Sequence, residues 1–236
     1  MYNRNSCPLV SVVIPVYNEN PKVIQEVIKD APRQWQIIVV DDGSETPCPL
    51  ATVRHEANLG YGASLKTGFY FAESELVATM DGDGQHTLDD IKRLLEFMDY
   101  FPNLDMVVGD RRIVEKSFVR WIGRKGLNWT ASLMAGRWIN DLNSGLRLFR
   151  KKVVFGYEPI LSDRFSFTTS LTLSMLCDGY SVDFLPVRVL GRRFGESKVR
   201  VFTDGWRTLK QILIIGFALQ TRTLRKWLRR LRGERG

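Results

Sequence analysis

The sequence predicts an α/β fold in which helices flank a mostly parallel central sheet. Short β-branched runs alternate along the chain with helical segments, which is typical of right-handed βαβ units. Several of these runs end directly in acidic or polar residues. The chain has 236 residues, of which 44% are apolar and 25% charged. It is therefore long enough to bury a large core and too apolar to be intrinsically disordered.

The N-terminal half contains five short apolar runs that we interpret as strands, because each is bounded by turn residues. They lie at 10–16, 36–40, 52–55, 75–80 and 106–109. Helices are expected between them at 19–30, 60–74 and 88–100. The last of these carries its apolar residues on one face, as a helix covering a sheet does.

The C-terminal half is richer in tryptophan and arginine. A helical stretch is expected at 117–139, a helix at 165–177, a strand at 182–189 and an amphipathic segment at 204–220. The last segment, 221–236, has apolar residues at helical spacing among many basic residues. We therefore expect a catalytic domain over 1–200, with 117–139 as an amphipathic insertion, and a basic membrane-interface tail over 201–236.

The cysteine content and the apolar segments indicate the cellular compartment in which the protein works. The three cysteines are far apart and the chain has two histidines, so neither a disulfide framework nor a structural zinc site is expected. No signal peptide is visible at the N-terminus. The apolar run at 212–219 is much shorter than the ~20 residues that cross a bilayer. These features favour a cytoplasmic protein, held peripherally at the cytoplasmic face of a membrane if it binds one.

Polar residues follow three of the predicted strands. They are Tyr17-Asn18-Glu19, Asp41-Asp42-Gly43 and Asp81-Gly82-Asp83. Ligands of open α/β sheets bind beyond the carboxyl ends of the strands. The sequence therefore predicts that these residues converge on one site.

Asp81 and Asp83 are the strongest chemical signal. Two carboxylates separated by a glycine can share a hard cation such as Mg²⁺ or Mn²⁺, which keeps positions open for phosphate oxygens. The alternative is a solvated Asp-Gly turn. His86 could ligate the metal, but we expect it to position or cap the turn.

Two further motifs have plainer alternatives. Asp41 and Asp42 can accept hydrogen bonds from a ribose or a base, or can serve as a cap or turn, and both roles can coexist. The glycine-rich segment at 60–66 lacks the spacing of a phosphate-binding P-loop, so an ordinary strand-to-helix loop is favoured.

Taken together, the motifs resemble those of family 2 glycosyltransferases, which have the GT-A fold. The segments that carry the resemblance are Ser11–Glu19, Val39–Ser44, Gly60–Gly68 and Asp81–His86. Asp141–Phe149 and Arg193–Lys198 look like the polyprenyl-phosphate (dolichyl-phosphate mannose synthase-like) branch. The similarity spans residues 9–200.

The resemblance implies a role for each matching residue. Nucleotide contacts fall on Pro15, Tyr17, Glu19, Asp41, Asp42, Gly43, Asp81 and Gly82, and metal contacts on Asp81, Asp83 and Gln85. Acceptor-phosphate contacts fall on Arg111, Arg124 and Asn128, although the family often has serine in place of Asn128. Arg193, Ser197 and Lys198 would lie near the donor diphosphate or on a loop. The implied catalytic residues are Asp83, Arg111 and Arg124.

The implied reaction is an inverting transfer of a hexose from a nucleotide-sugar donor to a polyprenyl (dolichyl or undecaprenyl) phosphate. Mannose from GDP-mannose is expected first and glucose from UDP-glucose next. A lipid phosphate is already anionic, so the enzyme needs alignment and charge neutralisation more than a general base. The alternative is a soluble family 2 enzyme acting on a saccharide or protein hydroxyl, with Asp141 as the candidate base.

The acceptor places the protein at a membrane. Amphipathic helices with Trp and Leu on one side and Arg on the other lie in the interface of an anionic membrane, which suits 117–139, 204–220 and the tail. Alternatively, the first two pack on the sheet, or the Trp-rich helices form an oligomer. The net charge of +8 does not favour nucleic acid, because it concentrates in the tail and no reading motif is present. Intact Asp81 and Asp83 argue against a catalytically inactive binding protein.

Overall fold

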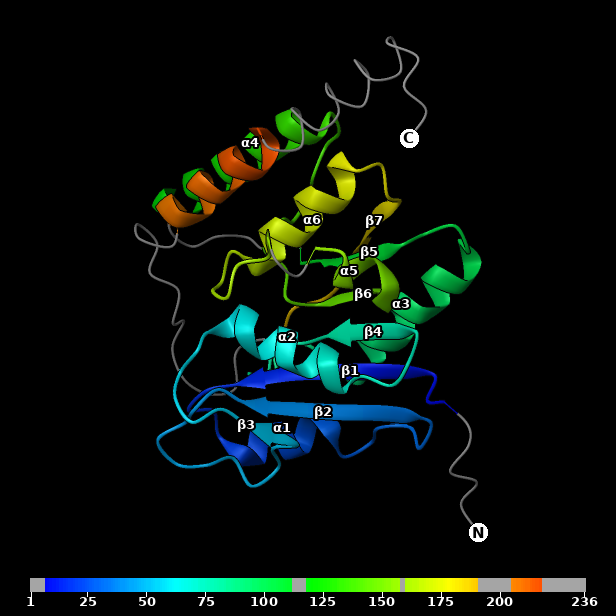
Figure 1. The fold of residues 1–236 in the computed structure, drawn as a ribbon. Helices are drawn as coiled ribbons and strands as arrows, with labels where there is room; N and C mark the ends of the chain where they lie inside the picture. The colour runs from blue at the N-terminus through cyan, green and yellow to red at the C-terminus, as the bar shows by residue number, and fades with distance from the viewer. Residues whose placement is uncertain (1–6, 112–117, 158–159, 191–204, 218–236) are drawn as a thin grey trace.

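A computed structural model describes residues 7–111, 118–157, 160–190 and 205–217 (Figure 1). Seven strands in these ranges form one sheet, in the order β3-β2-β1-β4-β6-β5-β7. Their bounds are β1 Val10–Val16, β2 Trp35–Asp41, β3 Val53–Arg54, β4 Leu76–Thr79, β5 Met106–Asp110, β6 Arg147–Arg150 and β7 Val182–Pro186. All neighbours pair in parallel except β6, which runs antiparallel to β4 and β5. The predicted mostly parallel sheet is confirmed.

Helices cover both faces of the sheet. They are α1 Pro21–Ile28, α2 Tyr61–Phe71, α3 Leu88–Tyr100, α4 Phe118–Ala135, α5 Lys151–Phe155 and α6 Phe167–Cys177, with a further helix at 205–217. One core joins α2 and α6 to the sheet through residues such as Phe69 and Leu171. The other joins α1 and α3 to the opposite face through Ile24 and Ile91. The result is a three-layer α/β arrangement.

Local sequence explains where the helices on the second face begin. Asn20 caps α1 by accepting a 3.0 Å hydrogen bond from the backbone N–H of Lys22, and Pro21 occupies the first turn. At α3, Thr87 and Asp90 form a reciprocal capping box. These caps place α3 directly after the Asp81–His86 motif.

The sequence did not predict β6 or α5. The first and last residues of β6 are arginines, so the sequence RLFR does not look like a buried strand. Arg147 is nevertheless only 1% exposed. Its guanidinium donates to the carbonyl oxygens of Leu142 (2.8 Å) and Ser144 (2.8 Å) and to Thr172 Oγ1 (2.5 Å). Internal acceptors thus allow a cation in the middle of the sheet.

The helix at 205–217 lies beside α4, as Figure 1 shows in orange and green. The two helices approach closely, because a Cβ on Gly216 would lie 2.4 Å from Met134 Sδ. Ile212 and Ile215 are buried in the same core as α2 and α6. Part of the predicted C-terminal tail therefore packs on the α/β fold, and the rest of it lies outside the described residues.

Candidate active site

The carboxyl ends of β1, β2, β4, β5 and β7 point to one edge of the sheet, because these strands are parallel through their neighbours or through β6. Tyr17 and Glu19 follow β1, Asp42 follows β2, Asp81 follows β4 and Arg111 follows β5. The structure thus brings the predicted nucleotide, metal and acceptor residues to the same edge.

Three elements fix the Asp81 carboxylate. The phenol of Tyr61, the first residue of α2, donates a 3.0 Å hydrogen bond to Asp81 Oδ1. Gly145 lies against the carboxylate, since a Cβ there would be 2.5 Å from Oδ1 and 2.6 Å from Oδ2. The Thr79 hydroxyl in turn holds Gly145 by donating to its carbonyl at 2.7 Å. Asp81 therefore sits in a preformed orientation.

Asp83 occupies a tight turn that packs against β1. Its side chain is buried, and Oδ1 accepts a 3.0 Å hydrogen bond from the backbone N–H of Gln85. Gly84 has φ +74°, which favours glycine, and a Cβ on Gly82 would lie 2.9 Å from Val16 Cγ1. The glycines of the motif thus serve this close turn.

These donors fit a hard divalent cation that shares its coordination with a substrate. In the described ranges, no three His, Cys, Asp or Glu side chains cluster as a protein-only metal cage. Mg²⁺ characteristically binds one or two carboxylates and completes its shell with substrate phosphates and water. Asp81 and Asp83 offer that kind of oxygen-donor pair.

His86 is buried beside this turn. Burial lowers its pKa, in spite of the nearby Asp81 and Asp90 carboxylates, so the imidazole is neutral at pH 7. Nδ1 lies 3.9 Å from Asp90 Oδ2, beyond hydrogen-bond distance, and has no partner among the described residues. His86 lies just before the Thr87 and Asp90 cap of α3, and its positioning role stays a prediction.

Asp41 and Asp42 hold loops of the protein. The oxygens of Asp41 accept hydrogen bonds from the backbone N–H groups of Ser44 and Cys48, both at 2.9 Å. Burial acts to raise the pKa of Asp41, but these hydrogen bonds and Arg54 lower it on balance. Asp42 accepts from His55 Nδ1 at 2.8 Å and from the backbone of 59 and 60. Both carboxylates take the turn-forming role that the sequence left open.

The glycine-rich segment that starts α2 packs against another loop. A Cβ on Gly60 would lie 2.3 Å from the carbonyl oxygen of Asp163, and one on Gly62 would lie 2.0 Å from that of Ser162. Lys66 Nζ pairs with Asp163 Oδ1 at 2.7 Å and donates to the Leu161 carbonyl oxygen at 2.7 Å. The glycines of this segment therefore let its backbone approach the loop at 162–163, as expected for an ordinary strand-to-helix loop.

Arg111 forms a bidentate ion pair with Asp141. Nε lies 2.8 Å from Oδ2 and Nη2 lies 3.0 Å from Oδ1. Burial acts to raise the pKa of Asp141, but Arg111 and, to a smaller extent, Arg124 lower it on balance. The two predicted acceptor-site arginines therefore lie around one carboxylate, a link that the sequence did not reveal.

The other predicted acceptor residue, Asn128, has contacts of its own. Its amide nitrogen donates to the carbonyl oxygen of Asn140 at 2.7 Å, and its oxygen accepts from the backbone N–H of Leu142 at 3.4 Å. It thus ties α4 to the segment that begins at Asp141. The position of Asn128 on the helix did not indicate this contact with the backbone of Asn140 and Leu142.

The predicted loop residues Arg193, Ser197 and Lys198 lie outside the described residues. The described chain that precedes them reaches the metal motif, because the backbone N–H of Leu190 donates to the Gln85 carbonyl oxygen at 3.0 Å. Sequence reasoning assigned no role to Tyr61, Gly145 or Arg147. All three lie within segments that carry the family resemblance, Tyr61 in 60–68 and the other two in 141–149. The hydroxyl of Tyr61 was the available signal.

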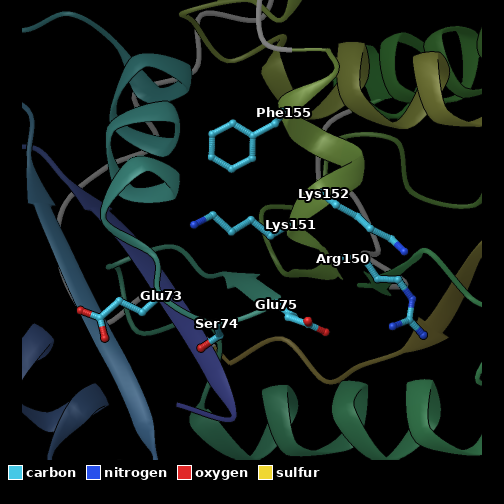
Figure 2. A pocket seen from close by; sticks show the side chains of 7 residues that line it. All are labelled: Glu73, Ser74, Glu75, Arg150, Lys151, Lys152 and Phe155. Atoms are coloured by element: carbon cyan, nitrogen blue, oxygen red, sulfur yellow. The ribbon is translucent and has the colours of Figure 1, made fainter. Parts of the chain in front are cut away.

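A cavity of about 380 Å³ lies at the opposite edge of the sheet (Figure 2). Its lining residues are Glu73, Ser74, Glu75, Arg150, Lys151, Lys152 and Phe155. Lys151 donates to the Ala72 carbonyl and lies 5.3 Å from the centre of the Phe155 ring. Arg150 donates to the carbonyl oxygens of 102 and 104. Two of the basic side chains that line the cavity therefore bind backbone carbonyl oxygens of the protein itself. The strand-end site is distinct from this cavity.

Large apolar side chains are exposed on α4, just after it and on the helix at 205–217. Its exposed side chains are Trp121, Ile122, Trp129, Leu133, Trp138, Trp206, Leu213, Ile214 and Phe217. Both helices also bury an opposite face, through Ala131 and Ile212 for example. In the described ranges, every helix is too short or too polar to cross a membrane. We call this set of nine residues the aromatic surface.

Comparisons with known proteins agree with the geometry. The model of the family "Glycosyl transferase family 2" matches residues 11–157. The polyprenol monophosphomannose synthase of Mycolicibacterium smegmatis is 27% identical, over 80% of this chain and 80% of that protein. The UDP-N-acetylglucosamine–dolichyl-phosphate N-acetylglucosaminyltransferase of Methanococcus voltae is 28% identical, over 88% and 96%.

Solved structures show the same fold. Glucosyl-3-phosphoglycerate synthase from Mycobacterium tuberculosis, in complex with Mn²⁺, UDP and phosphoglyceric acid, superposes with a TM-score of 0.70. The match covers 89% of this chain and 78% of that one at 15% identity, so it bears on the fold alone. The family match extends over more than half of the chain, from β1 to the end of α5. The chain belongs to glycosyl transferase family 2 and has the GT-A fold.

Proposed function

We propose that this protein is an inverting glycosyltransferase that moves a hexose from a nucleotide sugar onto a polyprenyl phosphate. The observation that carries the proposal is the Asp81 and Asp83 pair held at the carboxyl end of β4. Similar relatives, including an undecaprenyl-phosphate mannosyltransferase of Micrococcus luteus that is 27% identical, are named for transfer to polyprenyl phosphates. GDP-mannose is our first candidate donor and UDP-glucose the next.

The donor half of the site follows from β1, β2 and β4. Pro15, Tyr17 and Glu19 would contact the base and ribose, while Asp41 and Asp42 shape the adjoining loops through their backbone hydrogen bonds. Asp81 and Asp83, with Gln85 beside them, would hold a Mg²⁺ or Mn²⁺ ion. That ion would neutralise the donor diphosphate and favour its departure.

The acceptor half is built around Arg111 and Arg124. Guanidinium groups suit phosphate oxygens because their planar donors can bind two oxygens at once. Arg111 also has to satisfy Asp141, which would hold it in place for the acceptor. The phosphate nucleophile would then meet C1 of the sugar in line with the leaving diphosphate, and a single displacement inverts that carbon.

The structure disfavours the alternative of a hydroxyl acceptor with Asp141 as its base. A general base works best with a pKa near the operating pH. The pKa of Asp141 is instead lowered, against the effect of burial, by Arg111. Both of its oxygens face Arg111 at 2.8 and 3.0 Å, which leaves the carboxylate poorly suited to take a proton.

We further propose that the aromatic surface rests on an anionic membrane and brings the site to its lipid. Exposed apolar patches of this kind mark membrane or protein contacts. Lys125 on α4, with Arg207 and Lys210 on the other helix, would provide the cationic flank of an interfacial helix pair. We therefore propose peripheral attachment, at the cytoplasmic face of the membrane.

The test is a transfer assay with full-length protein, Mn²⁺ and a polyprenyl phosphate in detergent. Radiolabelled GDP-mannose, UDP-glucose and UDP-N-acetylglucosamine are offered separately. We expect label in the organic phase with one donor, and its loss in Asp83→Ala but not in Asp99→Ala, which changes an exposed carboxylate. Metal-dependent hydrolysis without organic label for any donor would refute lipid transfer and favour a water-soluble acceptor.

A further inference from the structure

We propose that Tyr61 is a positioning residue for the reaction and that it sets the orientation in which Asp81 meets the metal and diphosphate. The inference rests on the proposed function, because it assigns Asp81 to the donor site. It goes further by naming a residue of α2 that acts through that carboxylate.

The two oxygens of Asp81 differ in their hydrogen bonds to the described residues. Oδ1 accepts the Tyr61 hydroxyl at 3.0 Å, while Oδ2 accepts no hydrogen bond from any residue that the structure describes. Gly145 closes the carboxylate from another side, at a distance that leaves no room for a methyl group. The carboxylate can therefore neither rotate freely nor offer both oxygens equally, and Oδ2 is the oxygen available to a ligand.

The phenol is itself held firmly. Its ring stacks on Phe165 with centroids 5.5 Å apart and an interplanar angle of 18°. The backbone on either side is fixed by Gly60 and Gly62, which touch the carbonyl oxygens of Asp163 and Ser162. Tyr61 thus links the loop before α6 to Asp81.

The direction of the hydrogen bond is also fixed. An ionised carboxylate can only accept, so the Tyr61 hydroxyl is the donor in its 3.0 Å hydrogen bond to Asp81 Oδ1. This donor would hold the carboxylate in one orientation and leave Oδ2 to face a ligand. Hydrogen bonds to metal-binding carboxylates of this kind orient the ligand and tune its affinity.

The test compares Tyr61→Phe with Tyr157→Phe. Tyr157 also donates its hydroxyl to an aspartate, with 2.8 Å from Oη to Asp178 Oδ2, but it does so away from the strand-end site. Mn²⁺ binding to the full-length protein is measured by electron paramagnetic resonance, with UDP and with GDP in separate titrations. Transfer kinetics are measured on the same preparations.

We expect Tyr61→Phe to weaken Mn²⁺ binding about 10-fold or more. Its kcat should fall while the KM for polyprenyl phosphate stays the same, and Tyr157→Phe should change neither quantity. Equal Mn²⁺ affinity in Tyr61→Phe and wild type would overturn the positioning role alone. A wild-type protein that binds no Mn²⁺ with either nucleotide would overturn the metal part of the proposed function as well.

Discussion

Arg111 and Asp141 face each other through two parallel hydrogen bonds, at 2.8 and 3.0 Å, at the end of β5. Asp141 begins the segment that leads to Gly145, which lies against Asp81. One short stretch of chain therefore touches an arginine proposed for the acceptor and a carboxylate proposed for the donor. This arrangement would keep the two anionic substrates in register.

Asp141→Asn should damage both stability and transfer. It removes the negative partner of Arg111, whose side chain is only 16% exposed. Breaking a buried ion pair from one side costs about 3–5 kcal/mol, because the remaining charge is left uncompensated. Urea unfolding should show this loss, while Asp163→Asn, which breaks the more exposed pair with Lys66, should cost less than about 1 kcal/mol. Similar losses in the two variants would contradict the structural weight given to Arg111 and Asp141.

Stability should fall as the pH is lowered from neutral into the acid range. The pKa of Asp141 and that of Asp41 are both lowered from 3.8 in the folded protein. A carboxylate with a lowered folded pKa contributes stability above its unfolded pKa, and that contribution is lost as pH falls through the folded value. The lowered pKa of His86 makes stability fall as the pH drops below about 6.5, because the unfolded imidazole then binds a proton that the buried one does not. The two carboxylates add a further decline in urea midpoint below about pH 4. The decline should be shallower in Asp141→Asn, and an equal slope in the variant would count against Asp141 as a source.

The sequence predicted where the strand-end residues lie better than it predicted the contacts among them. Parallel strands carry whatever follows them to one edge, so Asp42 and Asp81 could be placed together from strand order alone. The Arg111–Asp141 pair could not, because its partners are 30 residues apart and meet only once β6 inserts between β4 and β5. That strand was missed since its buried cation, Arg147, contradicts the usual pattern of an apolar run.

Gly145→Ala should inactivate the enzyme without unfolding it. The added Cβ would lie 2.5 Å from Asp81 Oδ1, so the carboxylate has to move away from the position that Tyr61 and Gly145 define. We expect transfer to fall by about 100-fold, as it does when a reacting group is misplaced by about 1 Å. Gly156→Ala is the control, because its nearest neighbour lies 3.6 Å away and φ is −66°. Full activity in Gly145→Ala would show that Asp81 tolerates another orientation.

Arg147→Met should destabilise the protein although it replaces a buried cation with an apolar side chain. The carbonyl oxygens of Leu142 and Ser144 would lose their donor, and each buried acceptor left unpaired costs about 1–3 kcal/mol. Burial lowers the pKa of Arg147 to about 10, so the native side chain is still charged at pH 7. Arg147→Lys should not restore stability, because an ammonium group cannot reproduce the fork that reaches both carbonyls. Unfolding curves at pH 7 measure both variants, and a Met variant as stable as wild type would refute this account.

Removal of large side chains from the aromatic surface should abolish vesicle binding and leave the fold unchanged. Trp206 and Phe217 are 70% and 71% exposed, so Trp206→Ser and Phe217→Ser remove little packing within the protein. Burying such a side chain in a bilayer interface is worth roughly 1.5–3 kcal/mol, so each change should weaken partitioning about 10-fold or more. Co-sedimentation with vesicles of anionic and neutral lipid measures the effect, and Tyr100→Ser, at a side chain 79% exposed on α3, is the matched control. Added salt should weaken binding to anionic vesicles in part, because it screens the basic residues and not the apolar contact. If Tyr100→Ser reduced binding as much as Trp206→Ser, the aromatic surface would not be what holds the enzyme to its lipid. If salt alone released the protein completely, the contact would be a general electrostatic one.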